Sequence, residues 1–137
     1  AVAPLAAVLE ANDAVGRVCI GSFSDERIDA LRQRLGRELC TSPGPRALVQ
    51  LMAQSWWPRV RGTGIDHGAV QIPVRFGPVV LTKRQVDRFH DLGLQVHVWT
   101  INDENDMRRL LDLGVDAVMT DKTTVLKRVM VERGEWT

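Results

Sequence analysis

This 137-residue chain has almost no net charge. Its 18 basic and 17 acidic side chains leave a formal charge of +1 at pH 7. A chain balanced in this way has no general electrostatic attraction for nucleic-acid phosphates or for an anionic membrane surface. The composition therefore gives no reason to expect nucleic acid as a partner.

Cysteine is also scarce, and long apolar runs are missing. The two cysteines, Cys19 and Cys40, lie in short apolar runs, so we expect buried free thiols rather than a disulfide or a redox pair. Nothing approaches the spacing of zinc ligands. No apolar run reaches the roughly 20 residues that span a bilayer. Residues 1–13 lack the basic segment of a signal peptide, and they do not reveal a cellular location.

The sequence does contain five short runs rich in apolar and β-branched residues, separated mostly by segments with helical periodicity. We expect strands at Arg17–Phe23, Glu38–Ser42, Ala69–Pro73, Leu94–Thr100 and Val115–Asp121. A helix precedes the first strand and one follows each strand, and such strict alternation predicts parallel strands joined by right-handed crossovers.

The helices are expected from apolar residues three and four positions apart and from residues that begin or end helices. Thr82 and Gln85 form a capping box, Asp103 caps the next helix, and glycines at 36, 93, 114 and 134 close helices. The apolar positions are Leu5, Val8 and Leu9; Ile28, Leu31 and Leu35; Val86 and Phe89; Met107, Leu110 and Leu111; and Val125, Leu126, Val129 and Met130.

Two architectures fit this order. Five βα units in 137 residues average about 27 residues each, close to the mean of an eight-unit (β/α) barrel. A complete five-stranded doubly wound sheet fits as well. The one long irregular stretch, Arg59–Gly68, is expected to be a surface loop.

In both architectures ligands bind at the C-terminal ends of the strands. The residues expected there are Ser22, Phe23, Thr41, Ser42, Gln71, Trp99 to Asn102, Thr120 and Asp121. Helix caps need the same polar residue types, so capping competes with ligand binding at each position. Ser24 and Asp103 are interpreted as caps alone.

The strand Leu94–Thr100 shows the clearest alternation. Gln95, His97 and Trp99 share one face, while Val96 and Val98 share the other. In a barrel the valine face packs against helices and the polar face points inward, which makes His97 an interior histidine rather than a catalyst. No strand ends in two carboxylates, so neither a hard-metal site nor two-carboxylate acid–base chemistry is expected in this chain.

The stretch VHVWTIN at 96–102, followed by GVDAVMTD at 114–121, resembles glycerophosphodiester phosphodiesterases. These enzymes have the (β/α)8 (TIM) barrel fold, and the two stretches resemble its seventh and eighth strands. RVCIGSF at 17–23 resembles the fourth strand, AVQIP at 69–73 the sixth, and VLKRVMVERGEW at 125–136 the closing helix. One departure is Thr123, where the family commonly has proline.

The resemblance implies that residues 1–137 are the C-terminal part of one barrel domain, about five βα units. The intact barrel is then expected to hydrolyse a glycerophosphodiester to glycerol 3-phosphate and an alcohol with a divalent cation, Ca²⁺ or Mg²⁺. The family's catalytic histidines and metal ligands lie in the preceding half, so no catalytic or metal-binding residue is expected here. The residues expected to bind substrate are Trp99, Asn102, Phe23, Ser22 and Gln71.

Two further expectations follow from a half-barrel. The chain alone should be inactive, and its exposed strand edges at Arg17–Phe23 and Val115–Asp121 should bind the missing N-terminal half or a second copy. The alternative is a non-catalytic half-barrel or degenerate module that binds a small phosphorylated ligand at the same strand ends.

Overall fold

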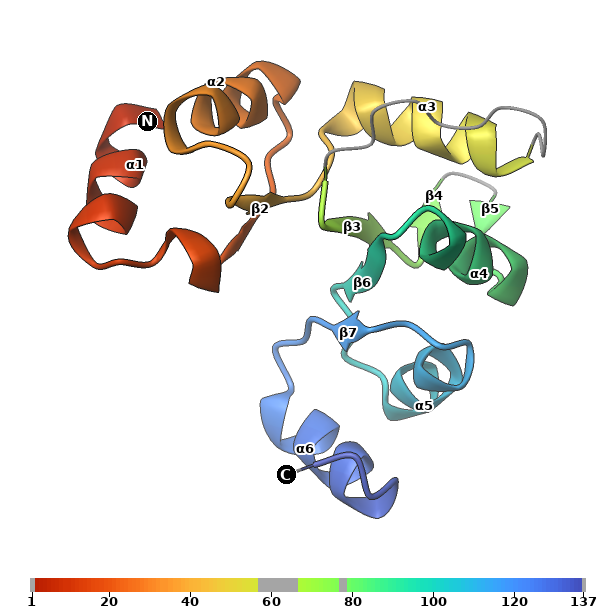
Figure 1. Cartoon of the computed structure of the whole chain (residues 1–137). Helices are drawn as coiled ribbons and strands as arrows, with labels where there is room; N and C mark the ends of the chain where they lie inside the picture. Colours follow the sequence, from red (N-terminus) through yellow and green to blue (C-terminus); the bar gives the residue numbers. More distant parts are fainter. Residues whose placement is uncertain (1, 57–66, 77–78, 137) are drawn as a thin grey trace. The chain divides into compact units, whose positions relative to one another are not determined.

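The computed structural model describes residues 2–56, 67–76 and 79–136, in which helices alternate with short strands (Figure 1). Two compact units result: residues 1–70 with 92–94, and residues 71–91 with 95–137. The first half of the chain contains α1 Val2–Ala11, a 3-10 turn at Val15–Arg17, β1 Cys19–Ile20, α2 Asp25–Leu35, β2 Cys40–Thr41 and α3 Pro45–Trp56. The second half contains β3 Ala69–Pro73, β4 Arg75–Phe76, β5 Val79–Val80, α4 Lys83–Asp91, β6 Gln95–Trp99, α5 Glu104–Asp112, β7 Ala117–Val118 and α6 Thr123–Glu132.

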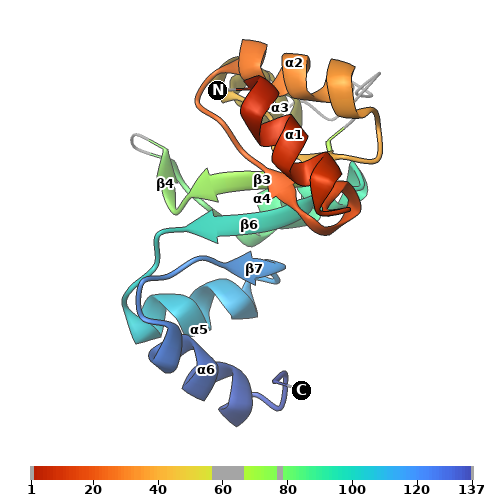
Figure 2. The ribbon, with the colours of Figure 1, turned by 90° about the vertical axis from the view of Figure 1, so that its left-hand side faces the viewer.

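Parallel strand pairing is confirmed in both units. Strand β1 pairs with β2, and β6 pairs with β7, both in parallel. Strands β3, β6 and β7 lie side by side in that order (Figure 2). Each of the five predicted strands is present, although only β3 has the predicted bounds. The other four strands are shorter than predicted at both ends.

An antiparallel hairpin, β4–β5, follows β3 and was not predicted from the sequence. Most of the predicted loop Arg59–Gly68 lies outside the described residues, which resume at His67. None of the described helices combines the length and apolarity needed to cross a bilayer. Neither Cys19 nor Cys40 is part of a disulfide, and both are half-buried rather than buried as expected.

The core of the first unit forms where α1 and α2 pack together. Ala6, Leu9, Leu31 and Leu39 form one cluster of buried residues there. The predicted apolar face of α1 was partly wrong, because Leu5 is 37% and Val8 57% exposed. The small Ala6 takes the inward position instead, which allows the two helices to approach closely.

The N-terminus of α3 is capped by a residue from a different helix. The Asp25 carboxylate accepts hydrogen bonds from the backbone N–H groups of Arg46 (3.2 Å) and Ala47 (3.3 Å). These N–H groups have no partner within their own helix, so an external carboxylate satisfies them and also interacts favourably with the helix dipole. Gly44 leaves room for this carboxylate, since a Cβ on Gly44 would lie 2.5 Å from Oδ1 of Asp25.

In the second half of the chain the predicted helix signals are confirmed. The Gln85 side chain accepts hydrogen bonds from the backbone N–H and hydroxyl of Thr82, both over 3.0 Å. Val86 and Phe89, which belong to α4, are completely buried. Gly93 and Gly114 have positive φ angles of 76° and 88°, a conformation that favours glycine at the end of a helix.

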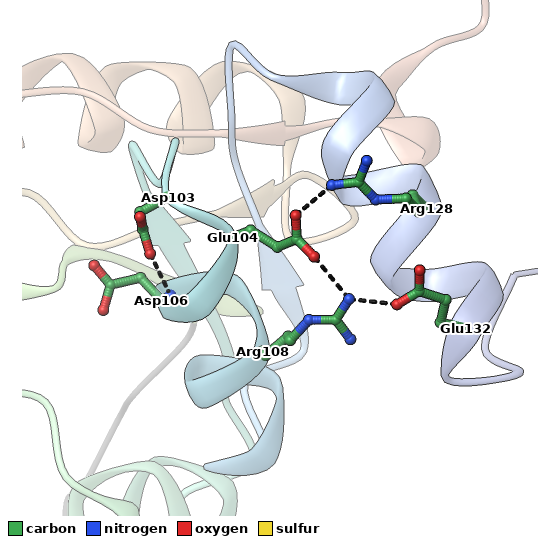
Figure 3. A network of polar contacts seen from close by, with 6 residues as sticks. All are labelled: Asp103, Glu104, Asp106, Arg108, Arg128 and Glu132. Carbon is green, nitrogen blue, oxygen red and sulfur yellow. Dashed lines mark hydrogen bonds and ion pairs between the residues drawn. The ribbon is translucent and has the colours of Figure 1, made fainter.

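Helices α5 and α6 are joined by an ion-pair network (Figure 3). Arg108 bonds to Glu104 at 2.8 Å and also to Glu132, while Glu104 additionally pairs with Arg128. The hydrogen bonds from Arg108 and Arg128 lower the pKa of Glu104. The buried side chains Met107, Leu110 and Val129 lie on the same two helices, so each helix has a buried apolar side as well as residues in the polar network.

Candidate functional site

The predicted alternation of β6 is confirmed by burial. Val96 and Val98 are fully buried, whereas Gln95 is exposed and His97 and Trp99 are half-buried. The Nε2 atom of His97 lies 3.3 Å from Oε1 of Gln95 on the same face. The indole of Trp99 therefore sits at the C-terminal end of β6, on the strand face opposite the buried valines.

The loops after β6 and β7 are linked through Asn102. Its Oδ1 accepts hydrogen bonds from the Thr120 hydroxyl and the Asp121 backbone N–H, each over 3.0 Å. Its Nδ2 donates to Oδ2 of Asp121 over 3.1 Å. The Thr120 hydroxyl also accepts from the backbone N–H of Lys122 at 2.9 Å. A polar cluster thus follows the two parallel strands where the sequence placed ligand-binding groups.

Asn102 is not the residue that caps α5. The cap of α5 is Asp103, whose carboxylate accepts from the backbone N–H of Asp106 over 3.0 Å, as predicted. Asn102, one residue earlier, is exposed and turns to the neighbouring loop instead. The amide, hydroxyl and carboxylate of this cluster can exchange hydrogen bonds with the hydroxyl groups of a polyol.

Ser22 and Phe23 lie at the end of β1 in the other unit. The Ser22 hydroxyl accepts a hydrogen bond from the Ser24 backbone N–H over 3.1 Å, which tightens the turn into α2. Ser24 caps that helix, as predicted. Phe23 is 84% exposed, a large apolar ring at a strand end. Gln71 is half-buried in the middle of β3.

A buried polar cluster in the first unit was missed. The hydroxyl of Thr41, which is fully buried, accepts from Nη1 of Arg32 at 2.8 Å and lies 2.9 Å from Nδ1 of His67. The guanidinium only donates, so the Thr41 oxygen is the acceptor in that bond, while the tautomer of His67 determines which group donates in the other. The one local signal is the position of Arg32 four residues after Ile28, on the inward side of α2.

A second polar cluster lies where β6 and β7 begin. Oδ2 of Asp116 accepts from the Val96 backbone N–H at 2.7 Å and lies 2.8 Å from Nε2 of His90. Burial favours a higher pKa for Asp116, but the hydrogen bonds from Val96 and His90 outweigh burial and lower it. Ligands bind at the opposite ends of parallel strands, so we assign this cluster to stability.

None of the polar clusters around Asn102, Thr41 and Asp116 provides a metal site. Within residues 2–56, 67–76 and 79–136, no group of three or more His, Cys, Asp or Glu side chains is arranged to hold a metal ion. Asp121 is the acidic member of the cluster around Asn102, and one carboxylate falls short of the several oxygen ligands that Ca²⁺ and Mg²⁺ require. These residues do not fit a divalent cation.

A sequence model of the "Glycerophosphoryl diester phosphodiesterase family" matches residues 6–125. The chain belongs to this family. It is 38% identical over 140 aligned residues to "Probable glycerophosphodiester phosphodiesterase 2" of Mycobacterium tuberculosis, a match that covers 99% of this chain and 53% of that protein. It is also 41% identical over 49 residues to "Lysophospholipase D GDPD1" of Mus musculus, covering 36% of this chain and 16% of that protein.

A solved structure supports the fold. The putative glycerophosphoryl diester phosphodiesterase from Silicibacter pomeroyi superposes with a TM-score of 0.76 at 24% identity, covering 99% of this chain and 45% of that chain. The family assignment and the parallel α/β structure therefore agree with the resemblance seen in the sequence. The chain spans about half the length of its M. tuberculosis relative.

Proposed function

We propose that this chain is the C-terminal half of a (β/α)8 barrel that hydrolyses a glycerophosphodiester to glycerol 3-phosphate and an alcohol. The observation that carries the proposal is the family match over residues 6–125, together with the alignment of nearly the whole chain to about half of a relative. In this proposal residues 1–137 belong to a single barrel domain and supply its last five βα units.

The role of this half is to form one wall of the substrate pocket. Trp99 provides an apolar surface at the end of β6, and Asn102 fixes the loop beside it through Thr120 and Asp121. Ser22, Phe23 and Gln71 are the other proposed wall residues. An indole that covers the glycerol or alcohol portion excludes water and contributes contact area without taking part in proton transfer.

The reactive groups are proposed to come from the other half of the barrel. The family resemblance implies a divalent cation, Ca²⁺ or Mg²⁺, but the described residues include no metal-binding group. We therefore assign the cation ligands and the catalytic histidines to a segment that precedes this chain in an intact barrel. The chain alone is expected to be inactive.

The test is a chimera in which this chain replaces the matching half of the M. tuberculosis relative. Glycerophosphocholine hydrolysis is measured with Mg²⁺ or Ca²⁺ for the chimera and for the isolated chain. Turnover by the chimera but not by the isolated chain supports the proposal, whereas turnover by the isolated chain contradicts it. A folded chimera that binds the substrate without hydrolysing it favours the alternative, a non-catalytic module that binds phosphorylated ligands.

The wall itself is tested by a pair of matched substitutions in the chimera. Trp99→Ala removes the proposed wall, and we expect a roughly tenfold loss in kcat/KM, the equivalent of about 1.4 kcal/mol. Trp136→Ala makes the same chemical change outside the proposed wall. The Trp136 indole follows α6, and the Lys127 ammonium group lies over its ring. This substitution should leave kcat/KM unchanged, and equal losses in both variants would remove Trp99 from the pocket.

A further inference from the structure

Cys19 and Cys40 face each other across β1 and β2. The two strands are parallel, and the register pairs Cys19 with Cys40 and Ile20 with Thr41. Neighbouring strands in a sheet lie about 4.8 Å apart. This separation falls within the roughly 4.4–6.8 Å range of Cα distances that a disulfide bridges.

Both thiols also lie on the same face of this sheet. Ile20 packs against the core that α1 and α2 form, and Thr41 bonds to Arg32 of α2. Because side chains alternate along a strand, Cys19 and Cys40 point to the opposite face, away from these helices. They are half-buried rather than enclosed, so a small reagent can reach them.

The environment holds the two sulfur atoms together. The Cys19 and Cys40 side chains share a hydrogen bond. The Sγ atom of Cys40 lies over Gly68, where an added Cβ would come within 2.7 Å of it. Any larger residue at position 68 would displace this sulfur, so the glycine preserves the space in which Cys40 faces Cys19.

We propose that Cys19 and Cys40 form a reversible dithiol–disulfide pair that peroxide oxidises. The Cys40 thiolate attacks one peroxide oxygen, which breaks the O–O bond and gives a sulfenic acid and hydroxide; a proton converts the hydroxide to water. Cys19 then attacks the Cys40 sulfur, loses its proton and displaces the hydroxyl group as a second water. In total, two thiols and one hydrogen peroxide give one disulfide and two waters.

The order of attack follows from the environment of Cys19. Burial raises the pKa of its thiol to about 12, and the hydrogen bond and charge of Cys40 contribute to the same shift. Cys19 therefore keeps its proton at neutral pH, while the thiolate is the nucleophilic form of cysteine. The raised pKa of Cys19 therefore favours Cys40 for the first attack and Cys19 for the resolving step.

The test is hydrogen peroxide treatment of the folded chain, followed by quenching, denaturation with N-ethylmaleimide and intact-mass measurement. We expect a monomer that has lost two hydrogens and takes up no maleimide, and that recovers both reactive thiols after reduction. The matched control is the double variant Cys19→Ser, Ile20→Cys, which keeps two thiols on the same strands but places them on opposite faces. Its closure should be more than about tenfold slower, because the folded chain no longer holds the two sulfurs side by side.

The wild-type chain in urea provides a second control that needs no substitution. Unfolding removes the pairing of the strands, so the disulfide should form more slowly in urea. The wild type and the double variant should then form it at similar rates. The proposal is overturned if the folded wild type gains only oxygen atoms, links only to second copies, or closes no faster than the control.

Discussion

Asn102 cross-links the loops that follow β6 and β7, because its Nδ2 donates to Oδ2 of Asp121 over 3.1 Å. Its Oδ1 accepts from the backbone N–H of the same aspartate and from the Thr120 hydroxyl. One side chain thus holds two strand ends together beside Trp99. The residue that the sequence predicts to bind substrate therefore also links these two loops.

Replacing Asn102 with alanine removes all three of these hydrogen bonds. We expect a loss of about 1 kcal/mol in the free energy of unfolding, because hydrogen bonds near solvent contribute modestly and water replaces some of them. Urea unfolding followed by circular dichroism measures the change. Asn105→Ala, at an exposed position on α5, is the control and should be neutral or slightly stabilising. Equal losses in the two variants would contradict a cross-linking role for Asn102.

The parts of this structure that were predicted correctly depend on neighbours in the sequence. The alternation of β6 and the cap at Asp103 each depend on a few adjacent residues, so local patterns were sufficient. The resemblance to a known family then favoured the barrel that we propose, a choice that periodicity alone did not make.

The features that were missed depend on residues far apart in the chain. Asp25 caps α3 from 21 residues away, and Thr41 lies beside His67 from 26 residues away. Neither pairing leaves a local signal. The face of α1 was misjudged for a similar reason: the close approach of α2 favours the small Ala6 over the exposed Val8.

Gly44 provides a direct test of the capping arrangement at α3. In Gly44→Ala the new methyl group would meet the Asp25 carboxylate at 2.5 Å and its Cα at 3.0 Å. We expect a destabilisation of roughly 1–3 kcal/mol, as for other overpacked sites, because the backbone of α2 or α3 must shift. Gly16→Ala is the control, since nothing lies within 4 Å of the added methyl group. Denaturation midpoints that move equally in both variants would show that the space at Gly44 is not needed.

The Asp116 carboxylate should make stability depend on pH. Its pKa is lowered in the folded chain, so its contribution is complete above the unfolded pKa of about 4 and is lost as the pH falls through the folded pKa. Asp116→Asn should therefore be less stable than the wild type near pH 7, by about 1 kcal/mol for the weakened hydrogen bonds. The difference should shrink on acidification. Thermal unfolding between pH 7 and pH 3 measures it, with Asp87→Asn in the exposed Lys83–Asp87 pair as the control.

The exposed strand edges lead us to expect that the isolated chain self-associates. Strand β7 ends the order β3–β6–β7, and β1 pairs only with β2 among the described strands. Unpaired N–H and C=O groups on such edges bind further strands, and a closed barrel removes them. Light scattering should show that the isolated chain self-associates as its concentration rises, while the chimera with a complete barrel stays monomeric. A monomeric isolated chain over the same range would favour a self-contained five-stranded domain over a half-barrel.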